Sequence, residues 1–187
     1  MRVAAMCGSM RTGSFNQALL RAAIERAPVH GLEIVQADIS AFPVFSQDFE
    51  KTGFPEPVLE AKALIQSADC LLLVTPEYNY GVPGVLKNAV DWVSRPFGDP
   101  TLRGRPMALM GASTGYMGTI RAQMAWRQLW HFFRTPVFSG AELTVAFAAK
   151  AFDESGVLTD ETYAGLLEAY LGALGQWLAR GGHGPLG

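Results

Sequence analysis

The sequence predicts an α/β protein in which a parallel β-sheet is covered by helices on both faces. Five strand candidates alternate with five helix candidates along the chain, an order typical of parallel sheets. The strand candidates are near-continuous apolar runs, as expected of strands that are buried on both faces. The chain has 187 residues, of which 49% are hydrophobic, and this suffices for one domain with a sizeable core. We expect a single domain over residues 1–180 and a flexible tail over residues 181–187.

The strand candidates are short apolar segments, and the run CLLLVT at residues 70–75 is the clearest buried strand among them. The helix candidates between them carry apolar residues at intervals of three and four. Ser14 and Gln17 can form a capping box at the start of the first helix, and Pro83 suits the first turn of the third. The strands are expected at residues 2–7, 32–37, 70–75, 106–111 and within 137–147, and the helices at residues 14–27, 57–67, 83–94, 116–133 and 159–179.

The loop CGSMRTGSFN, residues 7–16, follows the first strand candidate and leads into a helix candidate. The backbone N–H groups of such a loop, together with the N-terminus of the next helix, form an anion site. Ser9 and Ser14 add hydroxyl donors, Asn16 adds an amide, and Arg11 adds a planar cation that can clamp phosphate oxygens. A tight turn with an N-cap explains the glycines and Ser14 but explains Arg11 less well. The loop therefore favours a phosphate ligand.

Two common nucleotide motifs are excluded at this loop. Gly8 and Gly13 have the spacing of a Walker loop, but Ser14 stands where that motif requires lysine. Met10 breaks the G-x-G-x-x-G pattern of a dinucleotide fingerprint. A different phosphate ligand is indicated.

A second loop, within TPEYNYGVPGVLKNAVDW at residues 75–92, follows the third strand candidate. It is bounded by Pro76 and Pro83, and Tyr78 and Tyr80 offer flat surfaces for a ring. An ordinary strand–helix turn with aromatic packing explains this segment alone equally well. In the flavodoxin-like strand order 2-1-3-4-5, however, the first and third strands are neighbours at the switch point where FMN binds. The two loops together therefore predict a site for a mononucleotide with a flat heterocycle.

The segments GSMRTGSFN and PEYNYGVPGVLKNAVDW resemble the NADPH-dependent FMN reductase family, which includes quinone, chromate and azo-dye reductases. The resemblance covers the chain well from Arg2 to about Gly118. It implies a flavodoxin-like three-layer sandwich that binds FMN without a covalent bond. Gly81, where many relatives have serine, and Met10, where leucine is frequent, are mild departures from the family pattern. The cofactor-binding residues that the resemblance implies are Ser9, Arg11, Ser14, Phe15, Asn16 and Gln17 at the phosphate and ribityl end, Pro76, Glu77, Tyr78, Asn79 and Tyr80 along the isoalloxazine, and Ser113 and Gly115 after the fourth strand.

The same resemblance implies the reaction and its participants. NADPH or NADH would pass hydride to bound FMN, and a small acceptor would then be reduced: a quinone, free flavin, azo compound or chromate-like oxyanion. The cofactor carries the redox chemistry, so we assign no catalytic side chain. The family also implies a homodimer or homotetramer. We expect part of the helix at residues 116–133, which is apolar on two sides, to form the interface.

Two alternative functions are weighed against this one. GASTG at residues 111–115 matches the nucleophile elbow of serine hydrolases, with Ser113 as nucleophile. Asp153 or Asp160 would be the acid, and His183 in a glycine-rich segment would have to be the base, which is a poor place to fix a base. A flavodoxin-type electron carrier would share the fold but not the nicotinamide site. Such carriers are usually more acidic than this chain, whose net charge is −2.

Composition excludes several other classes. With 15 basic and 17 acidic residues, the chain gives no electrostatic reason to bind nucleic acid or an anionic membrane. Cys7 and Cys70 lie beside apolar runs and are expected to be buried thiols, and Cys/His metal spacings are absent. No apolar stretch is long enough for a membrane span. We expect a cytoplasmic protein without a bound metal.

The loop at residues 42–57 is expected either to cover the flavin edge or a partner, or to pack on its own aromatic residues.

Overall fold

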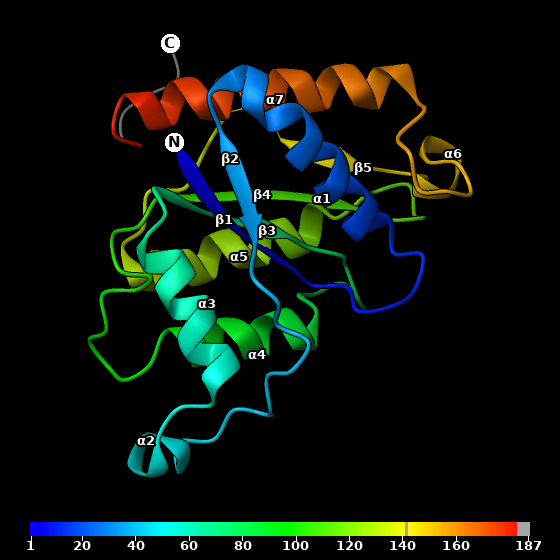
Figure 1. The fold of residues 1–187 in the computed structure, drawn as a ribbon. Coiled ribbons are helices and arrows are strands. Elements are labelled where there is room, and N and C mark those ends of the chain that lie inside the picture. Colours follow the sequence, from blue (N-terminus) through cyan, green and yellow to red (C-terminus); the bar gives the residue numbers. More distant parts are fainter. Residues whose placement is uncertain (141, 183–187) are drawn as a thin grey trace.

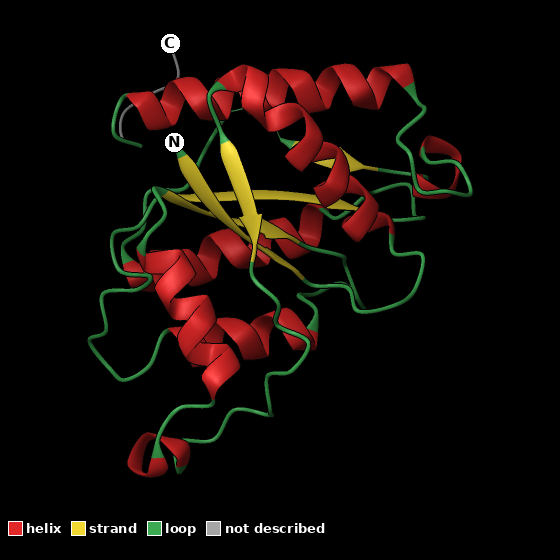
Figure 2. Cartoon of the chain, in the orientation of Figure 1, coloured by secondary structure: helices red, strands yellow, loops and turns green. Residues whose placement is uncertain are grey.

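The computed structural model describes residues 1–140 and 142–182. Its centre is a five-stranded parallel sheet in the order β2-β1-β3-β4-β5, as the sequence predicted. Figures 1 and 2 show this sheet between two layers of helices, with α1 and α7 on one face and α3, α4 and α5 on the other. The strands are β1 (Arg2–Cys7), β2 (Glu33–Gln36), β3 (Cys70–Val74), β4 (Met107–Ala112) and β5 (Leu143–Val145).

Each of the predicted helices is present. They are α1 (Phe15–Arg26), α3 (Glu56–Gln66), α4 (Gly84–Val93), α5 (Ile120–Phe133) and α7 (Glu161–Ala179). The chain also forms short elements that periodicity did not reveal, because four residues are too few to show a helical repeat. These are η1 (Ala27–His30), α2 (Phe49–Thr52) and α6 (Ala148–Ala151).

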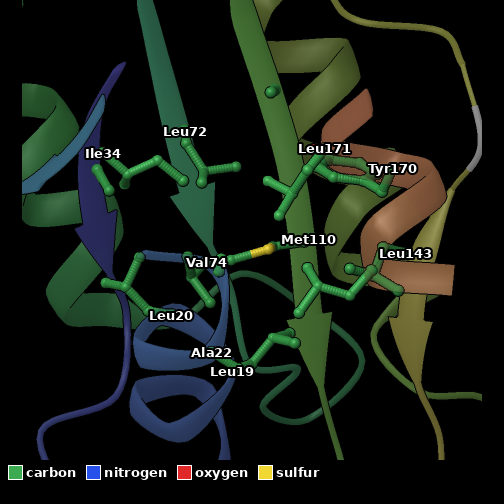
Figure 3. Close-up of a cluster of buried hydrophobic side chains, with 14 of the residues drawn as sticks. Leu19, Leu20, Ala22, Ile34, Leu72, Val74, Met110, Leu143, Tyr170 and Leu171 are labelled. Carbon is green, nitrogen blue, oxygen red and sulfur yellow. The ribbon is translucent and has the colours of Figure 1, made fainter. Parts of the chain in front are cut away.

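Alternate residues of each central strand face opposite helical layers. In β1, Val3, Ala5 and Cys7 pack in the cluster beneath α1 and α7, whereas Ala4 and Met6 pack towards α3, α4 and α5. Figure 3 shows the first cluster, in which Leu19 and Leu20 of α1 meet side chains from β3, β4 and α7. Because both faces are covered, the strands are apolar throughout, and the open positions for a ligand lie at the strand ends.

Helix α5 begins at Ile120, four residues later than its apolar spacing predicted. Gly118 has a φ of +58°, and a Cβ atom placed there would lie 1.7 Å from the Thr144 Oγ1 atom. The chain therefore passes β5 closely in a left-handed turn before the helix can start. This leaves residues 113–119 as a loop at the carboxyl end of β4.

The loop at residues 42–57 packs on α4 through aromatic contacts. The rings of Phe45, Phe49 and Phe54 surround Trp92, with centroid distances of 5.2, 5.3 and 5.9 Å. The Trp92 indole N–H donates to the Pro43 carbonyl at 2.7 Å. The loop is therefore held by its own aromatic residues around one buried tryptophan.

The predicted flexible tail falls largely on residues 183–187, which lie outside the described residues. Gly181 and Gly182 belong to the turn that ends α7, where the Gly182 N–H donates to the Trp177 carbonyl at 3.0 Å. Within residues 1–140 and 142–182, no helix combines the length and the apolar character that crossing a membrane requires.

Candidate functional site

A cavity of about 380 Å³ lies at the carboxyl ends of β1, β3 and β4. Ligand sites for small molecules usually have volumes of about 300–1,000 Å³, and in open parallel sheets they lie at this position. The predicted residues that line it are Ser9, Arg11, Ser14, Phe15, Asn16, Pro76, Glu77, Tyr78 and Ser113, together with Ala112 and Thr114. Of the remaining predicted residues, Gln17, Asn79, Tyr80 and Gly115 flank these positions in the chain and are not part of the wall.

The loop after β1 is fixed at both ends. The Gly8 N–H donates to the Val74 carbonyl of β3 at 2.9 Å. A Cβ atom on Gly8 would lie 2.7 Å from the Pro83 ring, so only glycine lets the loop approach α4 this closely. At the other end, Ser14 is the N-cap of α1, and its Oγ atom accepts from the Gln17 N–H at 3.2 Å. These contacts anchor the loop to β3, to the start of α4 and to α1.

Of the predicted capping box, only the contact of the Ser14 hydroxyl with the Gln17 N–H is formed. The Gln17 side chain donates to the Ser9 carbonyl at 3.4 Å and accepts from the Gln36 side chain at 3.2 Å. The N–H groups of Phe15 and Asn16, the first two residues of α1, have no partner inside the helix by its geometry. They are the donors that a phosphate at a helix N-terminus requires.

Arg11 lies at the mouth of the cavity with its side chain exposed. Its guanidinium carbon lies 5.0 Å from the centroid of the Phe15 ring, and its Nη1 atom donates to the Thr12 carbonyl at 3.3 Å. These weak contacts orient the cation without neutralising it, so Arg11 can still pair with a phosphate dianion.

Asn16 connects two walls of the cavity. Its side-chain amide donates to the Ala112 carbonyl at 2.8 Å and accepts from the Ala112 N–H at 2.9 Å. Asn16 is buried, and Ala112 is the last residue of β4. The paired hydrogen bonds therefore set the spacing between the start of α1 and the end of β4. The sequence identified Asn16 as a donor but gave no indication of Ala112 as its partner.

The loop after β3 forms a tight turn. Tyr78 and Gly81 exchange two backbone hydrogen bonds of 3.1 and 2.9 Å, and Asn79 and Tyr80 between them have φ values of +49° and +67°. Positive φ at both central residues is the geometry of a type I′ turn. This turn leaves the rings of Tyr78 and Tyr80 48% and 72% exposed beside the cavity. Tyr78 lines the cavity, whereas Tyr80 lies outside its wall.

Glu77 ties this turn to α5. Its carboxylate accepts from the backbone N–H groups of Arg121 and Ala122 at 2.9 and 3.2 Å. It also pairs with the Arg121 guanidinium at 3.1 Å. A negative charge at a helix N-terminus is favourable because it satisfies free N–H groups and complements the helix dipole. The Arg121 guanidinium in turn lies 3.9 Å from the centroid of the Tyr80 ring.

Arg121 was not among the predicted site residues. It follows Glu77 by 44 positions, and no short-range spacing in the sequence relates the two. Glu77 is expected along the isoalloxazine, and its side chain has a separate role in the contact with α5.

The third wall is the loop after β4. The Ser113 N–H donates to the Val145 carbonyl at 2.9 Å, and the Ser113 hydroxyl accepts from the Gly115 N–H at 3.1 Å. In the hydrolase alternative an acid would serve Ser113 through a histidine. Asp153 instead accepts from Ser155 and from the Val157 N–H, and Asp160 caps α7 at the Tyr163 N–H. His183 lies outside the described residues.

Cys7 ends β1 next to the loop but is not suited to act as a nucleophile. Burial raises the pKa of its thiol to about 11, against a smaller opposing effect of a hydrogen bond from the Ser9 backbone. The thiol is therefore neutral at physiological pH. Among residues 1–140 and 142–182, no group of three or more metal-binding side chains comes together.

The doubly wound sheet with its pocket at the switch point defines a flavodoxin-like protein. A sequence model of the NADPH-dependent FMN reductase family matches residues 1–150, and the chain belongs to this family of oxidoreductases.

Known proteins are similar to this chain over almost its whole length. An NAD(P)H-dependent FMN reductase of Pseudomonas aeruginosa is 42% identical over 180 residues, which cover 96% of each chain. An NAD(P)H:quinone oxidoreductase of Solanum tuberosum is 41% identical over 93% of this chain and 91% of its own. Among solved structures, the flavoenzyme FerB, an NAD(P)H:(acceptor) oxidoreductase of Paracoccus denitrificans, is 34% identical. It superposes with a TM-score of 0.87 over 96% of this chain and 97% of that one.

Proposed function

We propose that this protein binds FMN in the cavity at the carboxyl ends of β1, β3 and β4, and uses NADPH or NADH to reduce a small acceptor. The observation that carries the proposal is that two segments meet at one cavity. They are the loop at residues 7–16, which suits a phosphate, and the turn at residues 78–81, here called the aromatic turn. These segments are more than 60 residues apart in the chain. The family and the names of the relatives support the same assignment.

The residues that are present fit the cofactor. The free N–H groups of Phe15 and Asn16 and the exposed Arg11 suit a phosphate dianion. The segment Pro76, Glu77 and Tyr78 can border the ring with backbone groups, and Ser113 lines the same cavity. Bound FMN would supply the acceptance of a hydride and its delivery as two electrons to a second substrate.

The protein's own contribution is to bind and orient. Arg11 and the N-terminus of α1 would neutralise the phosphate, and the Glu77 contact with α5 would keep the aromatic turn rigid. Tyr78 lines the cavity and is 48% exposed, so its side chain suits flat substrates that arrive one after the other. We therefore propose a quinone as the preferred acceptor, with free flavin, azo compounds and chromate-like oxyanions as further candidates.

The test uses the visible absorbance of the purified protein after addition of FMN and desalting, followed by anaerobic NADPH or NADH. A retained flavin spectrum that bleaches, and that a benzoquinone restores, supports the proposal. Retained flavin that neither donor bleaches would make the protein an electron carrier. A negative FMN titration would exclude the cofactor, and an active-serine probe would then test Ser113.

A further inference from the structure

A second cavity, of about 370 Å³, lies at the opposite end of the sheet from the flavin pocket. It is formed where α4 ends, where the chain approaches the start of β4, and where α5 ends. Its wall includes Phe97, Asp99, Arg103, Phe132, Phe133 and Arg134. Nothing in the proposed FMN chemistry uses this cavity.

The walls are aromatic. Phe97 and Phe132 are 80% and 72% exposed, and the rings of Phe132 and Phe133 meet edge to face with centroids 5.1 Å apart. Large aromatic side chains gathered around a hollow at the surface are typical of binding sites. They favour a ligand with a flat apolar part.

The carboxylates around the cavity already form ion pairs with basic side chains of the protein. Asp99 pairs with Lys62 at 2.7 Å, and Glu50 pairs with Arg95. Burial acts to raise the pKa of Asp99, but hydrogen bonds from Lys62 and Thr101 and the charge of Lys62 lower it overall. Asp99 is therefore ionised, and its charge is balanced by Lys62.

Two arginines of the wall remain uncompensated. Arg103 and Arg134 are exposed, and neither forms an ion pair with another described residue. Two planar cations beside aromatic rings complement a carboxylate, sulfonate or phosphate carried on an aromatic ring.

The cavity is preformed by polar contacts. The Thr101 N–H donates to the Asp99 carboxylate at 2.8 Å, Gln66 donates to the Thr101 hydroxyl at 2.7 Å, and Arg105 donates to the Thr101 carbonyl at 2.7 Å. The Gly104 N–H reaches the Phe133 carbonyl at 3.3 Å and joins this segment to the end of α5. These contacts fix the backbone beneath the wall, which lowers the cost of ordering that part of the site on binding.

We propose that this cavity is a second ligand site, selective for small aromatic anions and independent of the FMN pocket. The anionic group pairs with Arg103 and Arg134, and the ring packs against Phe97 and Phe132. The inference does not depend on the identity of the cofactor in the first pocket.

The test compares two probes that differ in one charged group. Anilinonaphthalene sulfonate is the aromatic anion, and N-phenylnaphthylamine lacks the sulfonate. Each is titrated by calorimetry into the protein with and without FMN. We expect one saturable sulfonate site per chain whose affinity FMN does not change.

Variants of the two arginines locate the site. Arg103→Gln and Arg134→Asn remove the charges, and asparagine is chosen because Arg134 has a φ of +53° and asparagine tolerates this conformation. Each variant should lower the affinity for the sulfonate probe about tenfold, as loss of a charge-assisted hydrogen bond does. The affinity for the uncharged probe should not change. Phe132→Ala should weaken both probes.

Arg21→Gln is the matched control, because Arg21 is an exposed arginine that lines a different cavity, beside α1. Sulfonate binding that FMN abolishes, or that only Arg21→Gln weakens, would overturn the proposal. So would binding that persists unchanged in Arg103→Gln and Arg134→Asn. If the monomer binds the sulfonate probe and the oligomer does not, a second copy of the chain covers the cavity. That result would also overturn the proposal.

Discussion

Arg11 combines exposure with a fixed orientation, because its guanidinium rests on Phe15 and has no carboxylate partner within the described residues. A cation in this state is available to a phosphate. We predict that Arg11→Ala weakens FMN binding by about 1.5–3 kcal/mol, the contribution of a hydrogen bond to a charged group. Arg11→Lys should restore part of the loss. Flavin fluorescence titration measures both, with Arg103→Ala, an exposed arginine at the opposite end of the sheet, as a control. Equal FMN affinity in Arg11→Ala and the natural protein would refute the role.

Asn16 is a structural residue whether or not it also contacts a ligand. Asn16→Ala would leave the buried N–H and carbonyl of Ala112 without their partners, at a cost of about 1–3 kcal/mol for each group. We therefore predict that the free energy of unfolding falls by at least about 2 kcal/mol in the FMN-free protein, as measured by urea denaturation. Gln17→Ala, which removes a longer and more exposed contact, should cost less than about 1 kcal/mol. Similar losses in the two variants would contradict this assignment.

At the scale of elements, the aromatic turn and α5 form one unit through Glu77. Glu77→Gln keeps the shape of the side chain but removes its charge from the helix N-terminus. Charges at this position contribute about 0.3–1 kcal/mol, and up to about 2 kcal/mol when partly buried. We predict a loss of stability in that range together with weaker FMN binding. Glu168→Gln, which disturbs an ion pair of α7 with Arg26 and His30, is the control and should leave FMN affinity unchanged.

The regular elements could be predicted from the sequence because each carries its own pattern. The run of residues 70–75 is apolar throughout, and the spacing in α7 is helical over several turns. The start of α5 could not be predicted in this way, since Gly118 is constrained by Thr144 of another strand. The same distinction holds in the site. Ser9, Arg11 and Tyr78 follow strands and are visible as loop residues, whereas Arg121 and Ala112 are brought to the site only by tertiary packing.

At the scale of the whole molecule, α5 has one buried and one exposed apolar side. Trp126 and Trp130 are stacked with centroids 5.5 Å apart and are fully buried, so one of the two apolar sides of this helix belongs to the core. Met124 on the same helix is 64% exposed. We propose that the surface around Met124, and not the end of α5 that carries Phe132, forms the interface of a homo-oligomer.

Light scattering at micromolar concentration tests this interface. The natural protein should be a dimer or tetramer, and Met124→Glu should shift it towards smaller species because it buries a charge in an apolar contact. Val29→Glu, at a position that is 81% exposed on the other side of the sheet, is the control and should not change the mass. A monomeric natural protein would count against the proposal.

The burial of both thiols has a consequence for chemical self-protection. Quinones are electrophiles that arylate thiolates, so an enzyme that handles them risks modifying itself. Cys7 and Cys70 are completely buried, and burial raises the pKa of both thiols, which keeps them in the neutral, unreactive form at pH 7. We predict that mass spectrometry after incubation with a benzoquinone detects no cysteine adduct on the folded protein and adducts on both cysteines in urea. An adduct formed under native conditions would show that the fold does not shield its thiols. If no adduct forms, the same packing that builds the sheet also protects the protein from its proposed substrates.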